Sequence, residues 1–311
     1  MRHRLEYYLV RVVTGFVRVM PWTVSRSLGA LLGLAAYWID GAHRRVAMAN
    51  LAAAFPHRSM RETRKVARGV FKHFGRALFD LLKFSTLTPQ QMLASVEFQG
   101  EDRVRQAYAQ GRGVLFYTGH FGSWEQIAIV LAVKFEPVEV LARPLDNPDL
   151  NALLERLRSS TGGRVIYRRG AIRRVMRVLS RGHAVGMLVD QHLHGPDAVW
   201  VDFFGRPAAT TTALAAIALR TGAPVVPMFA VPLPGGGFRV MCEHPVEPPA
   251  ADSPDAVREF TQRCTDVLEM YVRRYPDMWL WMHRRWRAPE AATSEASGLL
   301  PGPGQDLPAD A

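Results

Sequence analysis

Residues 113–133, GVLFYTGHFGSWEQIAIVLAV, contain a short apolar run, a glycine-rich loop and a second apolar run. The first run, 114–118, is typical of a buried strand. After the Gly-His-Phe-Gly loop, Ser123 and Gln126 have the spacing of a capping box and predict a helix over 124–133. A strand, a tight loop and a helix in succession indicate an α/β fold.

His120 and Glu125 lie on either side of the turn from this strand into this helix. Residues five apart on one continuous helix are about 140° apart around its axis, whereas a strand-loop-helix corner can bring them together. The helix dipole favours an ionised Glu125, which can accept from one imidazole nitrogen and leave the other to take a proton. Backbone amides at the same helix end are candidate oxyanion donors. We therefore expect the components of acyl transfer here.

The rest of the chain fits one large α/β domain with appendages. Its 311 residues are 48% hydrophobic, which suffices for a full core. Further strands are expected at 184–189, 225–231 and 238–241, and we predict a central mixed sheet flanked by helices. The only cysteines, Cys242 and Cys264, have no paired spacing and no histidine cluster beside them. This argues against a disulfide framework or a structural zinc site and indicates a reducing, cytosolic setting.

The net charge of +11 is concentrated in residues 1–76, which hold 14 lysines and arginines and three acidic residues. The residues between these charges are strongly apolar. No aromatic stacking pattern or reading-helix signature accompanies the arginines, so we expect no nucleic acid as a partner. An anionic membrane surface is the expected partner of this segment.

Residues 1–40 have the pattern of interfacial helices. Pro21 interrupts them, and the longest uncharged run, 27–39, has 13 residues where a spanning helix needs about 20. We predict a monotopic or re-entrant anchor rather than a transmembrane span, with two ordinary core-facing helices as the alternative. Three arginines at a seven-residue spacing lie along one stripe of the otherwise apolar first helix, namely Arg4, Arg11 and Arg18.

Three segments are expected along the chain. The first is the membrane-associating segment, 1–40. A globular domain over 41–288 follows, in which Ser59 and Glu62 predict a capping box at the start of a long scaffold helix. The tail over 289–311 is rich in Ala, Pro, Gly and Ser and has almost nothing to bury, so we expect it to be disordered.

Residues 156–181 contain nine arginines and no acidic residue. Because guanidinium groups match phosphate and carboxylate oxygens, this surface is a candidate site for a lipid phosphate, a phosphopantetheine group or an acidic carrier protein. A solvated helix face is the alternative for most of them. The arginines are Arg156, Arg158, Arg164, Arg168, Arg169, Arg173, Arg174, Arg177 and Arg181.

Asp190 follows the expected strand 184–189 and so lies at a strand end, where sites of α/β proteins gather. His192 and His194 beside it suggest a metal site, but such a group is more often coincidental, and we assign no metal. The aromatic pair at 203–204 either lines an acyl groove or packs in the core, and packing is the favoured interpretation.

Residues 119–125 resemble the His-x4-Asp/Glu motif of the lysophospholipid acyltransferase superfamily and, within it, of the bacterial lipid A biosynthesis (late) acyltransferases. Several ordered matches are more specific than one pair of residues, and together they cover about residues 28–287. The further matches are Arg44–Leu51 with Phe55-Pro56, the Arg-Pro-x-x-Asn-Pro-x-Leu stretch at 143–150, the pair Asp190-Gln191 and the Trp-rich ending at 279–286.

The resemblance implies that His120 deprotonates an acceptor hydroxyl group, that Glu125 holds the imidazole and that the oxygen attacks an acyl thioester directly. Acyl carrier protein or coenzyme A is then the donor co-substrate, with no other cofactor. Arg143, Arg158 and Asp190 are the candidate substrate-binding residues. The resemblance also implies a glycerolipid acyltransferase-like fold, a lipid A precursor as acceptor, and a place at the cytoplasmic face of the bacterial inner membrane.

Other enzyme classes lack support in the sequence. There is no Gly-x-Ser-x-Gly elbow, His-Glu-x-x-His motif or Walker loop. The alternatives are an acyltransferase acting on another glycolipid or a lysophospholipid, a lipid or thioester hydrolase, and a non-catalytic membrane or nucleic-acid binder with the same fold.

Overall fold

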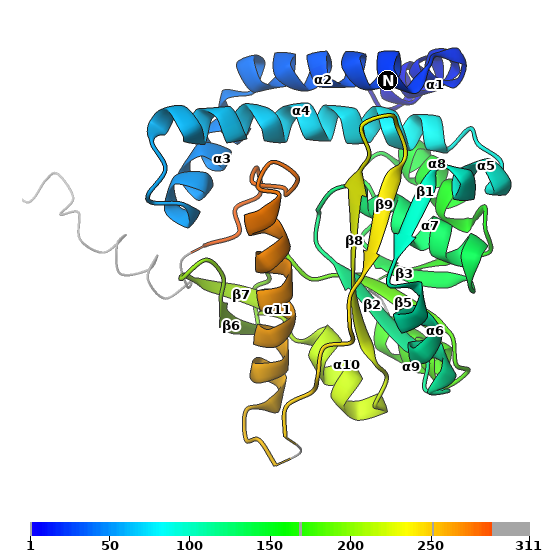
Figure 1. Cartoon of the computed structure of the whole chain (residues 1–311), viewed down its shortest axis with the longest axis vertical. Helices are drawn as coiled ribbons and strands as arrows, with labels where there is room; N and C mark the ends of the chain where they lie inside the picture. Colours follow the sequence, from blue (N-terminus) through cyan, green and yellow to red (C-terminus); the bar gives the residue numbers. More distant parts are fainter. Residues whose placement is uncertain (1, 168–169, 251, 288–311) are drawn as a thin grey trace, which may run out of the picture.

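A mixed sheet of seven strands forms the centre of the computed structural model, which describes residues 2–167, 170–250 and 252–287 (Figure 1). The strand order is β1-β9-β8-β2-β5-β3-β4, in which β1 and β9 run against the other five strands. This confirms the predicted central mixed sheet. The strands are β1 Val96–Gln99, β2 Val114–Thr118, β3 Val138–Ala142, β4 Arg164–Tyr167, β5 Ala184–Leu188, β8 Val225–Pro232 and β9 Phe238–Cys242.

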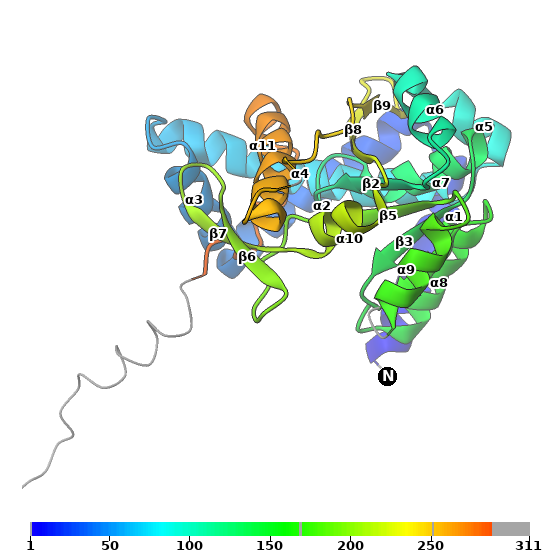
Figure 2. The same ribbon diagram turned by 90° about the horizontal axis from the view of Figure 1, so that it is seen from below.

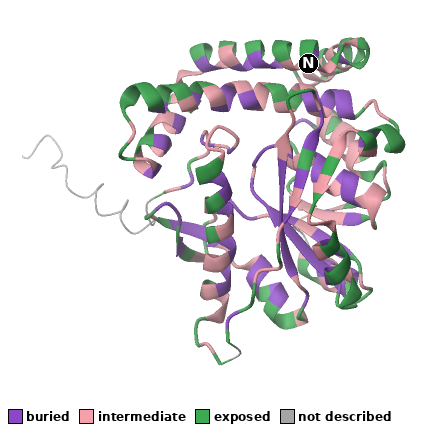
Figure 3. Cartoon of the chain, viewed as in Figure 1, coloured by how far each residue is buried: buried purple, intermediate pink, exposed green. Residues whose placement is uncertain are grey.

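Helices cover both faces of the sheet (Figures 1 and 2). Side chains of α5, α6 and α7 pack on one face, and those of α9, α10 and α11 pack on the other. Figure 3 shows that the strands between these layers are mostly buried. The helices in the described residues are α1 Arg2–Val19, α2 Trp22–Ile39, α3 Gly41–Ala54, α4 Met60–Phe84, α5 Pro89–Ala94, α6 Glu101–Ala109, α7 Trp124–Lys134, α8 Pro148–Ser159, α9 Ala171–Leu179, α10 Ala213–Thr221 and α11 Ala256–Arg274.

Helix α2 lies side by side with α4, in very close contact (Figure 1). A Cβ atom on Gly33 would lie 2.0 Å from the carbonyl oxygen of Phe71, and one on Gly75 would lie 2.1 Å from that of Gly29. The two backbones therefore approach closely because these positions lack side chains. The predicted capping box at the start of α4 is confirmed. The side chain of Ser59 accepts from the backbone N–H of Glu62, and the carboxylate of Glu62 accepts from the backbone N–H of Ser59.

Helix α1 is held at both ends by polar side chains of the domain. Lys83 of α4 is buried and donates to the carbonyl oxygens of Val17, Arg18 and Met20, which cap the carboxyl end of α1. At the other end, Asn147 donates to the carbonyl oxygen of His3. The same Asn147 side chain accepts from the first amides of α8, so it fixes α1 and α8 together.

The outward faces of α1 and α2 expose large apolar side chains. They include Leu5, Leu9, Phe16, Leu31 and Ile39, each more than half exposed. The predicted break at Pro21 is confirmed, since it separates the two helices. Among the described residues, no helix is both long enough and apolar enough to cross a bilayer.

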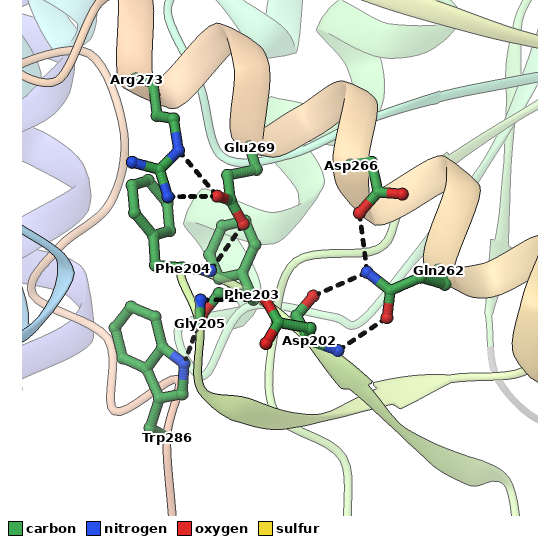
Figure 4. A network of polar contacts seen from close by, with 9 residues as sticks. All are labelled: Asp202, Phe203, Phe204, Gly205, Gln262, Asp266, Glu269, Arg273 and Trp286. Atoms are coloured by element: carbon green, nitrogen blue, oxygen red, sulfur yellow. Dashed lines mark hydrogen bonds and ion pairs between the residues drawn. The ribbon is translucent and has the colours of Figure 1, made fainter.

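A second sheet, the hairpin of β6 Ala198–Asp202 and β7 Pro207–Thr211, is fixed to α11 by polar contacts (Figure 4). Glu269 accepts from the backbone N–H of Phe204, a residue in the left-handed region with φ of 61°. Phe203 and Phe204 are almost fully buried. The packing interpretation of this pair is confirmed. The expected tail at 289–311 lies outside the described residues.

Candidate active site

His120 and Asp190 meet at the carboxyl edge of the sheet because β2 and β5 are neighbours. Thr118 pairs in register with Leu188, and each chain continues two residues to reach His120 or Asp190. The Nδ1 atom of His120 lies 2.8 Å from one oxygen of Asp190, and its backbone N–H donates to the other oxygen at 2.7 Å. A third donor, Nε1 of Trp279, lies 2.8 Å from that second oxygen. Asp190 is thus a fully engaged carboxylate that holds the imidazole.

The expected contact between His120 and Glu125 is wrong in this structure. Glu125 instead forms a bidentate ion pair with Arg158 of α8, with N···O distances of 2.8 and 3.1 Å. Glu125 lies in the first turn of α7, where its side chain is directed to α8 rather than back toward the loop. Arg158, which the sequence placed among the substrate-binding residues, is the ion-pair partner of Glu125 in the structure.

Burial and charge set the protonation of the pair. Burial by itself lowers the pKa of His120, but the charge and hydrogen bond of Asp190, together with the charge of Glu125, raise that pKa above 6.5. Burial raises the pKa of Asp190, yet His120 and the other donors outweigh it and lower that pKa to about 2. Asp190 is therefore ionised near neutral pH and accepts from Nδ1–H. The free Nε2 is then the basic nitrogen, and it lies 3.5 Å from Nε2 of Gln191.

Glycines on both sides of His120 permit this geometry. A Cβ atom on Gly119 would lie 2.9 Å from the Asp190 carboxylate, and one on Gly122 would lie 1.8 Å from the carbonyl oxygen of Ala230. Gly122 also has a φ of 59°, in the left-handed region. The loop backbone can therefore pass close to both neighbours only with glycine at these positions.

Two details of the predicted corner are corrected. Ser123 precedes α7 as expected, but its side chain makes no capping hydrogen bond. Its ψ of 49° is far from the extended value that directs an N-cap side chain at the helix amides. The amides of Gly122 and Ser123 already donate to the carbonyl oxygens of Met278 and Ala230. These two amides are therefore not available to an oxyanion.

The carboxyl-terminal segment packs against the loop that contains His120. Phe121 and Trp279 form an antiparallel bridge, and the backbone N–H of Leu280 donates to the carbonyl oxygen of His120. Asn50 of α3 donates to the carbonyl oxygens of Trp281 and His283 and so holds this segment. Two stretches of the family pattern that are far apart in the sequence thus support one loop.

Buried Arg285 adds a positive charge near Asp190. Its guanidinium donates to the carbonyl oxygen of Ala209 and to the hydroxyl group of Thr210. Burial lowers the pKa of Arg285 to about 10 although the charge of Asp190 opposes this. The guanidinium remains protonated near neutral pH and contributes to keeping Asp190 ionised.

Two cavities reach the site from opposite faces of the sheet. The inner slot, about 70 Å³, is mainly apolar and lies between α7 and the sheet, with Glu125 and Arg158 in its wall. The α9–α10 groove, about 600 Å³, lies on the other face and has Gln191 and His192 at one end. The His120 ring contacts Trp124, which lines the slot, and its Nε2 lies 3.5 Å from Nε2 of Gln191, which lines the groove.

Arg143 is not part of this arrangement. Its side chain is 86% exposed and pairs with Asp146, which is equally exposed. The rings of His192 and His194 meet edge to face near the site. Within the described ranges, no group of three or more histidine, cysteine or acidic side chains is arranged to hold a metal ion.

Trp279 and Gln191 are site residues to which sequence reasoning assigned no role. Trp279 belongs to the Trp-rich ending and Gln191 to the Asp-Gln pair, but neither motif specifies a contact with the loop that contains His120. The contact of Trp279 depends on how the carboxyl-terminal segment meets the sheet edge, and that of Gln191 depends on β5 lying next to β2.

Comparisons with known proteins agree with the motifs. The family described as bacterial lipid A biosynthesis acyltransferase matches residues 1–288. A lipid A biosynthesis lauroyltransferase of Escherichia coli is 29% identical over 88% of this chain and 89% of its own length. A lipid A biosynthesis acyltransferase of Haemophilus influenzae is 23% identical over 89% of this chain and 87% of its own. The crystal structure of the acyltransferase PlsC from Thermotoga maritima has a TM-score of 0.37 and 16% identity, covering 88% of this chain and 98% of that one.

Proposed function

The chain belongs to the bacterial lipid A biosynthesis acyltransferase family and is an acyltransferase, and we propose that it transfers a fatty acyl group from a carrier-protein or coenzyme A thioester to a hydroxyl group of a lipid A precursor. The observation that carries the proposed mechanism is the hydrogen bond between His120 Nδ1 and Asp190. It leaves Nε2 to act as a general base beside Gln191, which lines the α9–α10 groove.

In the proposed reaction, the acceptor hydroxyl group gives its proton to Nε2 of His120 while its oxygen attacks the thioester carbonyl carbon. Asp190 accepts from Nδ1–H throughout and stabilises the imidazolium that forms. The tetrahedral intermediate expels the thiolate as the C–S bond breaks, and the imidazolium returns its proton to sulfur. One ester forms, one thioester is consumed and His120 is regenerated without a covalent enzyme intermediate.

Glu125 acts through charge in this proposal. Its carboxylate raises the pKa of His120 without a hydrogen bond to it, and its ion pair with Arg158 fixes the position of α7 relative to α8. The same pair forms a polar part of the inner slot, whose remaining walls are mainly apolar.

We further propose that the protein lies on the cytoplasmic face of the bacterial inner membrane, without spanning it. The exposed apolar side chains of α1 and α2 support this, since such patches are uncommon on monomeric soluble proteins. Arg4, Arg11 and Arg18 on α1 are exposed as well, and they suit anionic lipid headgroups.

The test is an assay of the purified full chain with an acyl thioester, with and without a lipid A precursor, read by mass spectrometry. We expect an acylated product that forms only with the acceptor and is lost by at least about 100-fold in His120→Ala. Circular dichroism checks that this variant folds. Thioester loss that ignores the acceptor would indicate a hydrolase, and transfer to another glycolipid or lysophospholipid but not to the precursor would make the proposed acceptor wrong.

A further inference from the structure

The α9–α10 groove lies against the sheet and extends to Gln191, the neighbour of His120. On α10 it is lined by Ala213, Ala216, Ile217 and Arg220, which share one face of the helix and span about 10 Å. Gln191 lines the inner end and lies 3.5 Å from Nε2 of His120. Its volume of about 600 Å³ is in the range of small-molecule sites. An extended, mainly uncharged arm can therefore reach the base through this groove.

Basic residues gather beside the groove. Arg220 lines the groove itself and is exposed, and Asp197 is the acidic residue in its wall. On α9, Ile172 and Met176 face the groove, while Arg174 and Arg177 line a neighbouring cavity of about 280 Å³. The exposed side chain of Arg173 lies on the strip of α9 between these two spaces.

The neighbouring cavity has a strong excess of positive charge. Four arginines line it, with Glu139 as its one acidic residue. Glu139 is already paired with Arg174 at 2.9 Å. Within the part of the chain that the structure describes, no ion pair neutralises the other three. These three are Arg164, Arg177 and Arg181.

This basic surface is remote from the apolar helices. Figure 1 shows α9 and α10 at one end of the molecule and α1 and α2 at the opposite end. A membrane bound by α1 and α2 leaves the arginines of α9 exposed to the aqueous phase. The partner that fits them is therefore a soluble anion rather than a lipid surface.

We propose that the α9–α10 groove admits the pantetheine arm of the acyl donor and that Arg173, Arg177 and Arg220 dock the small acidic carrier protein that bears it. This inference rests on the proposed function, because it assumes an acyl thioester donor. The positive charge extends from the neighbouring cavity over the exposed strip of α9 to Arg220 at the groove, which suits an acidic protein helix better than one nucleotide.

The first test compares two donors, an acyl carrier protein thioester and the same acyl group on free pantetheine. In Arg173→Glu/Arg177→Glu we expect the KM for the carrier-bound donor to rise tenfold or more, with a weaker salt dependence. The KM for acyl-pantetheine and kcat stay unchanged. The matched control is Arg61→Glu/Arg64→Glu, which reverses two exposed charges on α4. An unchanged KM for the carrier-bound donor, or an equal rise for both donors, would overturn the docking proposal.

The second test fills the groove. Ala216 is exposed on α10, so Ala216→Trp adds bulk to the groove without disturbing the core. We expect the KM for both donors to rise and the KM for the lipid acceptor to stay unchanged. Unaltered donor KM values would show that the arm does not use the groove. Failure of the wild-type protein to transfer from either donor would instead refute the proposed function itself.

Discussion

The carboxylate that contacts the imidazole of His120 belongs to Asp190, which is 70 positions later in the chain, and not to Glu125 in the next helix. The nearer carboxylate is occupied by Arg158. The two carboxylates therefore have separable tasks. Asp190 selects the tautomer of the imidazole, and Glu125 adds negative charge near it.

Asp190→Asn should inactivate the enzyme more severely than Glu125→Gln. One oxygen of Asp190 accepts from two N–H groups, so an asparagine keeps its carbonyl oxygen there and presents its NH2 group to His120 Nδ1. The imidazole then carries its proton on Nε2 and cannot act as the base. We expect a loss in kcat of about 100-fold or more for Asp190→Asn. A larger loss in Glu125→Gln would return the orienting role to Glu125.

The pH profile should report the pKa of His120. This group must be unprotonated to accept a proton, so kcat/KM rises with pH through the pKa of His120 in the free enzyme. Because that pKa is raised, the midpoint of the acid limb should lie above 6.5. Glu125→Gln removes one of the charges that raise it and should move the midpoint to lower pH. An unmoved midpoint in this variant would contradict the role of Glu125 as a charge.

Gly122→Ala should destabilise the fold through the catalytic loop. The new methyl group would meet the carbonyl oxygen of Ala230 at 1.8 Å, and the backbone is in the left-handed region. We expect the free energy of unfolding, measured in urea, to fall by about 2–4 kcal/mol. Gly111→Ala is the control, since Gly111 has a φ of 70° but nothing within 4 Å of an added Cβ. It should cost only about 1–2 kcal/mol.

Membrane binding is better tested by point substitutions than by deletion of residues 1–40. Removing α2 would expose the face of α4 against which it packs, so a deleted chain would lose stability for a separate reason. Phe16 and Leu31 are 60% and 62% exposed. Phe16→Glu/Leu31→Glu should fold normally and sediment less with anionic vesicles. Met270→Glu, at an exposed residue of α11, is the control and should leave sedimentation unchanged.

Four strands of the sheet, near 114–118, 184–189, 225–231 and 238–241, were predictable because each has a local signal. The strand at 114–118 is a continuous apolar run, and the long helix α4 begins at a capping box. The partner of His120 was not predictable in this way. It depends on β5 lying next to β2, and the order of strands in a sheet has no local pattern in either strand. Asp190 could be placed at a strand end, but not opposite His120.

The contacts of the chain ends were the least predictable part. The Trp-rich ending was visible in the sequence, yet the hydrogen bond from Trp279 to Asp190 depends on α11 returning the chain to the sheet edge. The misassigned cap at Ser123 has a similar cause. The loop backbone follows its contacts with Ala230 and Met278 rather than the preference of a serine for an N-cap.

Trp279 also makes the surroundings of Asp190 depend on a segment that is synthesised late. The residue that completes the hydrogen bonds of Asp190 lies near the end of the described chain, long after His120 and Asp190 themselves. A nascent chain that ends within α11 contains both members of the pair but lacks the segment that supports them. Such a chain has neither the Trp279 hydrogen bond to Asp190 nor the bridge between Phe121 and Trp279 that supports the loop of His120.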